Sequence, residues 1–141
     1  MSHKRRRKAQ PQPDALTATD EALWRAASQG DHAGVQRLLA DGADPNAAGR
    51  HGTTPLMLAQ DVAMVDLLLA AGARLDAVDD FDNDAFAEAL AAEQPALIQH
   101  LLAAGADLNR RNKYGWTRLR SAAFSRSPQT VAQLLALGAD P

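Results

Sequence analysis

Cysteine is missing from this chain of 141 residues, and aromatic residues make up only 4% of it. The lack of cysteine excludes disulfides, thiolate metal sites and cysteine nucleophiles, and it is compatible with a reducing compartment. Since 46% of the residues are apolar but so few are aromatic, the interior must be built of Ala, Leu and Val. Small side chains let helices approach closely, which suits thin stacked layers better than one thick globular core.

Long apolar runs are also absent. No stretch approaches the roughly 20 apolar residues that a membrane-spanning helix requires. The charged start of the chain is not followed by an apolar segment, so we expect no secretory signal peptide. These features predict a cytoplasmic protein with no membrane span, and we favour a monomer.

Positive charge is concentrated at the start of the chain. The formal net charge is −2, but the run KRRRK contributes +5, which leaves −7 for residues 9–141. An acidic array disfavours a groove that follows a phosphate backbone along its length. Residues 1–14 have no apolar periodicity, so we expect a disordered basic tail.

The basic run permits three interpretations. It resembles a short nuclear-localisation signal, it would serve equally as a weak contact to nucleic acid or an anionic membrane, and it could be a solvated leader without a partner. Its residues are Lys4, Arg5, Arg6, Arg7 and Lys8.

Four similar segments organise the remainder of the chain. They are Val35–Asn46 (VQRLLADGADPN), Val65–Asp76, Ile98–Asn109 and Val131–Pro141. In each, a β-branched residue is followed by leucines three and four positions later, which gives a helix one apolar face. Each segment therefore predicts an amphipathic helix that packs on a neighbour.

A glycine ends each of these helices. Gly42, Gly72, Gly105 and Gly138 are 30, 33 and 33 residues apart. Glycine takes the left-handed conformation of a helix C-terminus without a steric penalty from Cβ. A fixed period of this size predicts a stacked-repeat architecture.

The segment Gly42–Ala59 (GADPNAAGRHGTTPLMLA) resembles the ankyrin repeat pattern, in which a Gly-Ala-Asp loop and a Gly-x-Thr-Pro-Leu turn join successive helix pairs. The resemblance implies an all-α solenoid of helix-turn-helix units joined by β-hairpin-like loops. We expect one ankyrin repeat domain over residues 15–141. Its four repeats would cover residues 15–47, 48–77, 78–110 and 111–141.

The first two repeats depart from the pattern in different ways. The first lacks Thr-Pro-Leu and a preceding hairpin, as an N-terminal capping repeat should. In the second, Thr54 can cap a helix that Pro55 begins, and Gln60-Asp61 shortens the turn, so we expect a short first helix or a tight turn.

The last two repeats replace residues of the turn itself. Asp82 takes the place of the turn glycine and should adopt a positive φ, while Asp84 remains a competent N-cap. In the fourth repeat Arg118 replaces the proline, Ser121 occupies an apolar position, and Pro128 can begin the second helix. The chain ends where a fifth repeat would begin, so we expect either a fragment of a longer array or an exposed last helix pair.

Chemical motifs are scarce. The histidines His3, His32, His51 and His100 lack metal-ligand spacing, and we expect His100 to be a half-buried structural imidazole. The acidic run from Asp80 to Asp84 resembles a calcium loop, but Ala85 and Ala91 stand where glycine and a bidentate glutamate are required, which favours a solvated turn. We expect no catalytic residue, no cofactor site and no metal site.

The resemblance implies that the hairpin tips and the adjoining concave face of the first helices bind a protein. The tip residues are Arg50, His51, Asp80, Phe81, Lys113, Tyr114 and Trp116, with Thr53 and Asn83 beside them. Aromatic residues and arginine are common interface anchors. The alternative is that Phe81 and Trp116 only lock neighbouring hairpins together. Trp24 and Phe124 could line the concave side, or Trp24 could cover the N-terminal end.

The sequence therefore predicts a non-catalytic protein-binding module whose partner is unknown. The alternative is a nuclear or nucleic-acid-associated adaptor that uses the basic tail.

Overall fold

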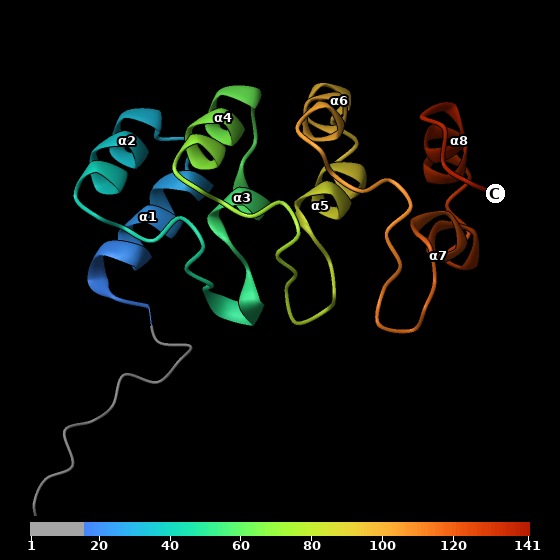
Figure 1. Cartoon of the computed structure of the whole chain (residues 1–141), viewed down its shortest axis with the longest axis horizontal. Helices are drawn as coiled ribbons and strands as arrows, with labels where there is room; N and C mark the ends of the chain where they lie inside the picture. The colour runs from blue at the N-terminus through green and yellow to red at the C-terminus, as the bar shows by residue number, and fades with distance from the viewer. Residues whose placement is uncertain (1–15) are drawn as a thin grey trace, which may run out of the picture.

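The computed structural model describes residues 16–141, so the predicted tail, with Lys4–Lys8, lies outside the described residues. The chain forms helix pairs that stack side by side, and we number each pair with its preceding loop as repeats 1 to 4 (Figure 1). The pairs are α1 (Ala18–Ser28) with α2 (His32–Ala40), α3 (Pro55–Leu58) with α4 (Val62–Ala70), α5 (Ala85–Ala91) with α6 (Pro95–Ala103), and α7 (Arg118–Phe124) with α8 (Pro128–Ala136). The all-α solenoid is confirmed.

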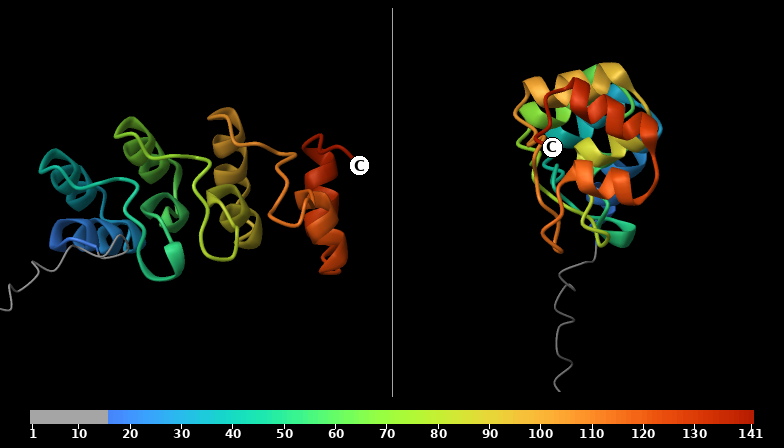
Figure 2. Two further views of the ribbon diagram at one scale, coloured as in Figure 1. Left: turned by 60° about the horizontal axis from the view of Figure 1, so that its bottom comes forward. Right: turned by 90° about the vertical axis from the view of Figure 1, so that its right-hand side faces the viewer.

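Two rows of helices make up the array. The first helices of the pairs (α1, α3, α5 and α7) form one row, and the second helices (α2, α4, α6 and α8) form the other (Figure 1). The loops between repeats extend beyond the row of first helices, and the end-on view shows them on one side of the molecule (Figure 2). The second-repeat loop contains a short 3₁₀ turn, η1 (Arg50–Gly52). This common direction brings the predicted tip residues to one edge.

The core lies between the two rows. Val35, Val65 and Ile98 are buried, as the repeated β-branched position predicts, and Phe86 is the bulkiest fully buried side chain. Alanines fill much of the remaining interior, including Ala26, Ala27, Ala85, Ala89 and Ala122. Small residues allow each helix pair to approach the next closely.

The predicted glycine stops are confirmed. Gly42, Gly72, Gly105 and Gly138 have φ values of 93°, 98°, 110° and 97°. The turn inside each pair is less uniform, because Gly30 has φ 70° in repeat 1 whereas Glu93 and Arg126 adopt φ 53° and 54° at the corresponding turns of repeats 3 and 4. These two residues hold a conformation that usually favours glycine.

Helix caps follow the sequence except at one position. Asp84 accepts a hydrogen bond from the Ala87 N–H at 2.9 Å, as predicted. The prediction that Thr54 caps α3 is wrong, because its buried hydroxyl oxygen makes no hydrogen bond. The helix has only four residues, and the Met57 N–H bonds to the backbone carbonyl of Thr54 at 3.1 Å. The shortness of α3 was expected from the Gln60-Asp61 turn.

The loops between repeats fold back on themselves like hairpins. Backbone N–H groups bond to carbonyls four residues later, from Gly49 to Thr53, Asp79 to Asn83 and Asn112 to Trp116, at 2.8–2.9 Å. Among residues 16–141, a single antiparallel bridge between Arg111 and Thr117 is the extent of the β pairing. Asp82 has φ 64°, which confirms the predicted positive value.

Trp24 joins repeat 1 to the loop of repeat 2. Its indole N–H donates a hydrogen bond to the Thr53 carbonyl at 3.0 Å. A Cβ at Gly49 would stand 2.6 Å from the Trp24 Nε1 atom. Trp24 therefore fixes the first hairpin against α1.

Gly49→Ala should destabilise the array by about 1–3 kcal/mol, because the added methyl group collides with the indole. The same substitution in a Trp24→Ala background should cost much less, since the indole is gone. Urea unfolding of the four proteins measures this coupling, and it controls for any backbone cost at Gly49. Equal costs in both backgrounds would show that the contact does not constrain this position.

Candidate partner-binding surface

The junction between repeats 3 and 4 is built differently from the other two. First helices pack on first helices, and second helices on second helices, from α1 to α5 and from α2 to α6. Helices α7 and α8 contact repeat 3 more sparsely, and Figure 1 shows them standing farther away. Charged side chains make the connection here, and they come from the turn positions that depart from the repeat pattern.

Asp84 and Arg118 form a buried ion pair across this junction. The two guanidinium NH groups of Arg118 donate to the two carboxylate oxygens of Asp84 at 2.8 and 2.5 Å. The Arg118 side chain is 8% exposed and the Asp84 side chain is 4% exposed. The Arg118 Nε also donates to the Asp107 carbonyl, and its guanidinium lies 4.7 Å from the ring centre of Phe86. Such bidentate geometry compensates for the desolvation of both charges.

Asp82 makes a second connection between the same repeats. Its carboxylate accepts a hydrogen bond from Arg110 at 2.6 Å and one from the Lys113 backbone N–H at 2.5 Å. Burial raises the pKa of Asp82, but the Lys113 N–H, the hydrogen bond from Arg110 and both positive charges outweigh it, so the pKa lies below its ordinary value. The ionised form of Asp82 is therefore favoured in the folded protein.

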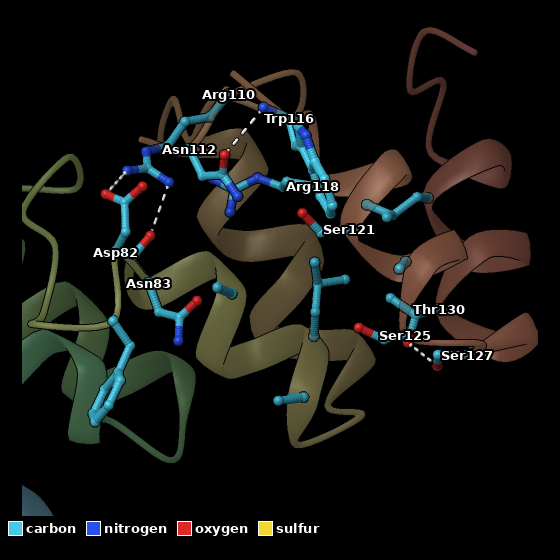
Figure 3. Close-up of a pocket in the computed structure, with 16 residues that line it drawn as sticks. Asp82, Asn83, Arg110, Asn112, Trp116, Arg118, Ser121, Ser125, Ser127 and Thr130 are labelled. Carbon is cyan, nitrogen blue, oxygen red and sulfur yellow. Dashed lines mark hydrogen bonds and ion pairs between the residues drawn. The ribbon is translucent and has the colours of Figure 1, made fainter. Parts of the chain in front are cut away.

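A pocket of about 270 Å³ lies between repeats 3 and 4. Leu90, Ala122 and Leu134 supply apolar walls, while Ser121 and Thr130 supply hydroxyl groups. Figure 3 shows Trp116 and Arg118 at one end of this pocket, and Ser125, Ser127 and Thr130 on the side formed by α7 and α8. The half-buried Ser121 was noted in the sequence as a polar residue at an apolar position, and here it faces a pocket.

Repeat 4 carries an aromatic cluster next to this pocket. The rings of Trp116 and Phe124 meet edge to face with their centres 5.1 Å apart, and the Arg120 guanidinium lies 4.6 Å from the Trp116 ring. Tyr114 and Phe124 are 71% and 74% exposed. Trp116 packs on its own repeat, on Phe124 of α7.

The predicted tip residues lie along one continuous edge. The Asp80 N–H donates to the His51 carbonyl at 2.9 Å, and the rings of His51 and Phe81 are 5.8 Å apart. Arg50 is exposed beside them. The Lys113 N–H bonds to Asp82, which joins the loop of repeat 4 to that of repeat 3. We call this edge, from Arg50 to Trp116, the loop edge.

Sequence reasoning missed the residues that hold the junction together. Arg110 and Arg118 were not assigned a role, and neither was Arg120, which covers Trp116. A usable signal was present: two turn positions of repeat 3 became acidic, while the neighbouring repeat gained arginines. Each repeat of such an array touches only its neighbours. When two adjacent repeats carry opposite charges at positions that differ from the repeat pattern, these positions are therefore expected to be in contact.

Two of the histidines pair with a carboxylate of a neighbouring repeat. His100 is half-buried, as predicted, and its Nε2 lies 2.6 Å from Asp66 on α4. His32 contacts Asp61 at 2.9 Å, and this hydrogen bond is the main reason that the pKa of Asp61 is lowered. In residues 16–141, no three His, Asp or Glu side chains are grouped to hold a metal ion. No helix in that range is long and apolar enough to cross a membrane.

These features define a helical-repeat protein whose loops present one continuous edge. The sequence model of the ankyrin repeat matches residues 21–50 and 51–80, which are adjacent and in register with the observed pairs. These two segments are ankyrin repeats, and the two helix pairs that follow have the same arrangement.

Two curated relatives share part of this sequence. The chain is 43% identical over 70 residues to a mitochondrial disaggregase of Bos taurus, and 45% identical over 67 residues to a mitochondrial disaggregase of Homo sapiens. The matches cover 48% and 45% of this chain but 10% of each relative. The chain thus spans about a tenth of the length of the curated relatives it matches.

Replacing both members of the buried pair by the residues of the repeat pattern should cost less than replacing Arg118 alone. Arg118→Pro leaves the Asp84 carboxylate buried without its counter-ion, which should destabilise the fold by about 3–5 kcal/mol. Asp84→Thr combined with Arg118→Pro removes both charges and keeps a capping residue and a helix-starting proline. Urea unfolding of the wild type, both single variants and the double variant measures the coupling. Additive effects would mean that the pair is not the connection described above.

Acidification should weaken the junction through Asp82. The pKa of Asp82 is depressed in the folded protein, so ionised Asp82 stabilises the fold at pH values above the ordinary aspartate pKa of about 4. This stabilisation is lost as the pH falls through the pKa that Asp82 has in the folded protein. The free energy of unfolding of Asp82→Asn should therefore fall less than that of the wild type between about pH 6 and pH 3. Asp80→Asn, at an exposed neighbouring carboxylate, is the control. Identical pH dependence in wild type and Asp82→Asn would contradict the assignment.

Proposed function

We propose that this chain is a non-catalytic protein-binding module that holds its partner on the loop edge and the adjoining face of α7. Ankyrin repeats generally mediate protein–protein interaction, which supports the general function. The observation that carries the specific surface is the exposure of Phe81, Tyr114 and Phe124, at 65%, 71% and 74%.

The exposed aromatics are unusual for this composition. The chain has six aromatic residues in all, and half of them are largely exposed in repeats 3 and 4. Water is a poor environment for such large apolar surfaces, and clustered aromatics beside a pocket are typical of binding sites. Since Phe124 packs on Trp116 and Phe81 packs on His51, the rings are also held in place before a partner arrives.

Similarity to the disaggregases supports the same function. The shared stretch is a tenth of those proteins, and in this chain it falls within a structure whose identified repeats are ankyrin repeats. We infer that the shared stretch serves protein recognition in this chain.

A second candidate rests on the five consecutive basic residues Lys4–Lys8. In that case the chain is an adaptor that also contacts nucleic acid through these residues, and its location is nuclear instead of cytoplasmic. Salt-dependent binding to DNA or RNA that disappears when residues 1–8 are deleted would establish this second function.

Affinity capture from the native cell tests the proposed surface. The baits are the intact chain and a variant with Phe81→Ser, Tyr114→Ser and Phe124→Ser, whose exposed positions predict little change in melting temperature. We expect a partner that the intact chain retains and the triple variant loses. Leu135→Ala, at an exposed apolar residue of α8, is the matched control and should retain the partner. A partner that survives the triple substitution would place recognition elsewhere.

A further inference from the structure

Charge is segregated along the array. Residues 16–109 contain 15 Asp and Glu and 4 Arg, a formal charge of −11, whereas residues 110–141 contain six Lys and Arg and one Asp, a formal charge of +5. The C-terminal part of the array, from Arg110 onward, is therefore cationic although the rest of the array is acidic.

Several cations of repeat 4 lack an acidic partner. Arg110 and Arg118 are used in the junction, but Arg111, Lys113, Arg120 and Arg126 are exposed, and no carboxylate lies within ion-pair distance of them among residues 16–141. Elsewhere on the array, Arg25 and Arg74 pair with carboxylates of their own repeat or loop, whereas Arg37 and Arg50 are exposed and have no ion-pair partner among residues 16–141. Repeat 4 thus presents positive charge that the described part of the chain does not neutralise.

Two of these cations stand beside aromatic rings, one beside the exposed Tyr114 and one beside the half-buried Trp116. The Lys113 ammonium lies 5.4 Å from the Tyr114 ring centre, and the Arg120 guanidinium lies 4.6 Å from that of Trp116. A guanidinium held against a ring keeps N–H groups free for a carboxylate, and its position is fixed in advance. We name Lys113, Tyr114, Trp116, Arg120 and Phe124 the repeat-4 patch.

We propose that the repeat-4 patch binds an acidic segment of another protein, with carboxylates on Lys113 and Arg120 and apolar side chains on the aromatic rings. This inference rests on the proposed function and specifies the chemistry of the partner. The adjoining pocket of about 270 Å³ is small for a cofactor-sized ligand but suits one side chain of such a segment.

The restricted extent of positive charge favours a protein segment over a nucleic acid. A nucleic acid gains affinity by placing many successive phosphates against cations. Here the cationic surface occupies one repeat, and the neighbouring loop presents Asp79 and Asp80. A phosphate backbone that continued past repeat 4 would meet like charge, whereas a short acidic segment can end within the patch.

Selection from a library of random peptides displayed on phage tests this proposal with the full chain as the immobilised target. We expect enriched peptides to combine Asp or Glu with aromatic or aliphatic residues. Synthetic versions of those peptides should bind at least about tenfold more weakly to Arg120→Glu than to the wild type, and more weakly at high salt than at low salt. Arg126→Glu is the matched control, because it makes the same charge change in the same repeat, and Glu93 already occupies the corresponding turn of repeat 3.

Several results would overturn the inference. Enriched peptides without acidic residues, binding that Arg120→Glu leaves unchanged, equal weakening by Arg126→Glu, or no enrichment at all would each do so. A DNA or RNA oligonucleotide that binds the wild type and is lost in Arg120→Glu would show that the patch serves nucleic acid. Sedimentation of the wild type as an oligomer that Arg120→Glu dissociates would show that the patch holds a second copy.

The two proposals fail in distinguishable ways. Peptides that lack acidic residues but require Tyr114 and Phe124 would refute the acidic segment and leave the binding module intact. Affinity capture that is unaffected by the loop-edge substitutions would instead refute the proposed surface itself.

Discussion

Each helix pair in this protein has apolar faces that the pair cannot cover by itself, and stacking on a neighbour is the only way to bury them. This constraint explains why small residues dominate the interior, since alanine at positions such as Ala26 and Ala89 lets adjacent pairs approach closely. It also explains the repeated glycine stops, because in every repeat the chain must leave the second helix at the same point to begin the next loop. The loops then project from one side, and the loop edge follows from the stacking.

The last junction satisfies the same constraint by different means. Between repeats 3 and 4, ion pairs replace part of the close helix packing. Burying charges is costly, and here the cost is offset because Asp84 receives two hydrogen bonds from Arg118 and one from the Ala87 N–H. The wider spacing leaves the pocket beside Trp116. The features that we propose for binding therefore arise where the regular packing is interrupted.

The periodic features of the fold could be predicted from the sequence alone. The glycine stops, the cap at Asp84 and the positive φ of Asp82 depend on residues within one repeat, and local rules describe them well. The failures concern contacts between repeats. Trp24 is the example, because its indole packs against the loop of repeat 2 at a position where Gly49 leaves room for it.

The candidate site was predictable in the same partial way. Tip residues such as Phe81 and Tyr114 could be named because the repeat pattern places them in turns, and the structure shows both exposed. For the arginines of the junction the signal was only the opposite charges in adjacent repeats, because their partners lie 28 and 34 residues away. The role of Arg120 depends on where the Trp116 ring lies, and no sequence pattern gives that position. Whether the tips contact a partner stays a prediction that the binding experiments address.

The paired charges at the last junction also fix the order of the repeats. Asp82 and Asp84 of repeat 3 correspond to Gly52 and Thr54 of repeat 2, so the arginines of repeat 4 have no counterparts on any other repeat of this chain. Repeat 4 placed directly after repeat 2 would bury the Arg118 guanidinium without a carboxylate. A shortened or shuffled array is thereby disfavoured, because repeat 4 finds carboxylates for its arginines only when it packs on repeat 3.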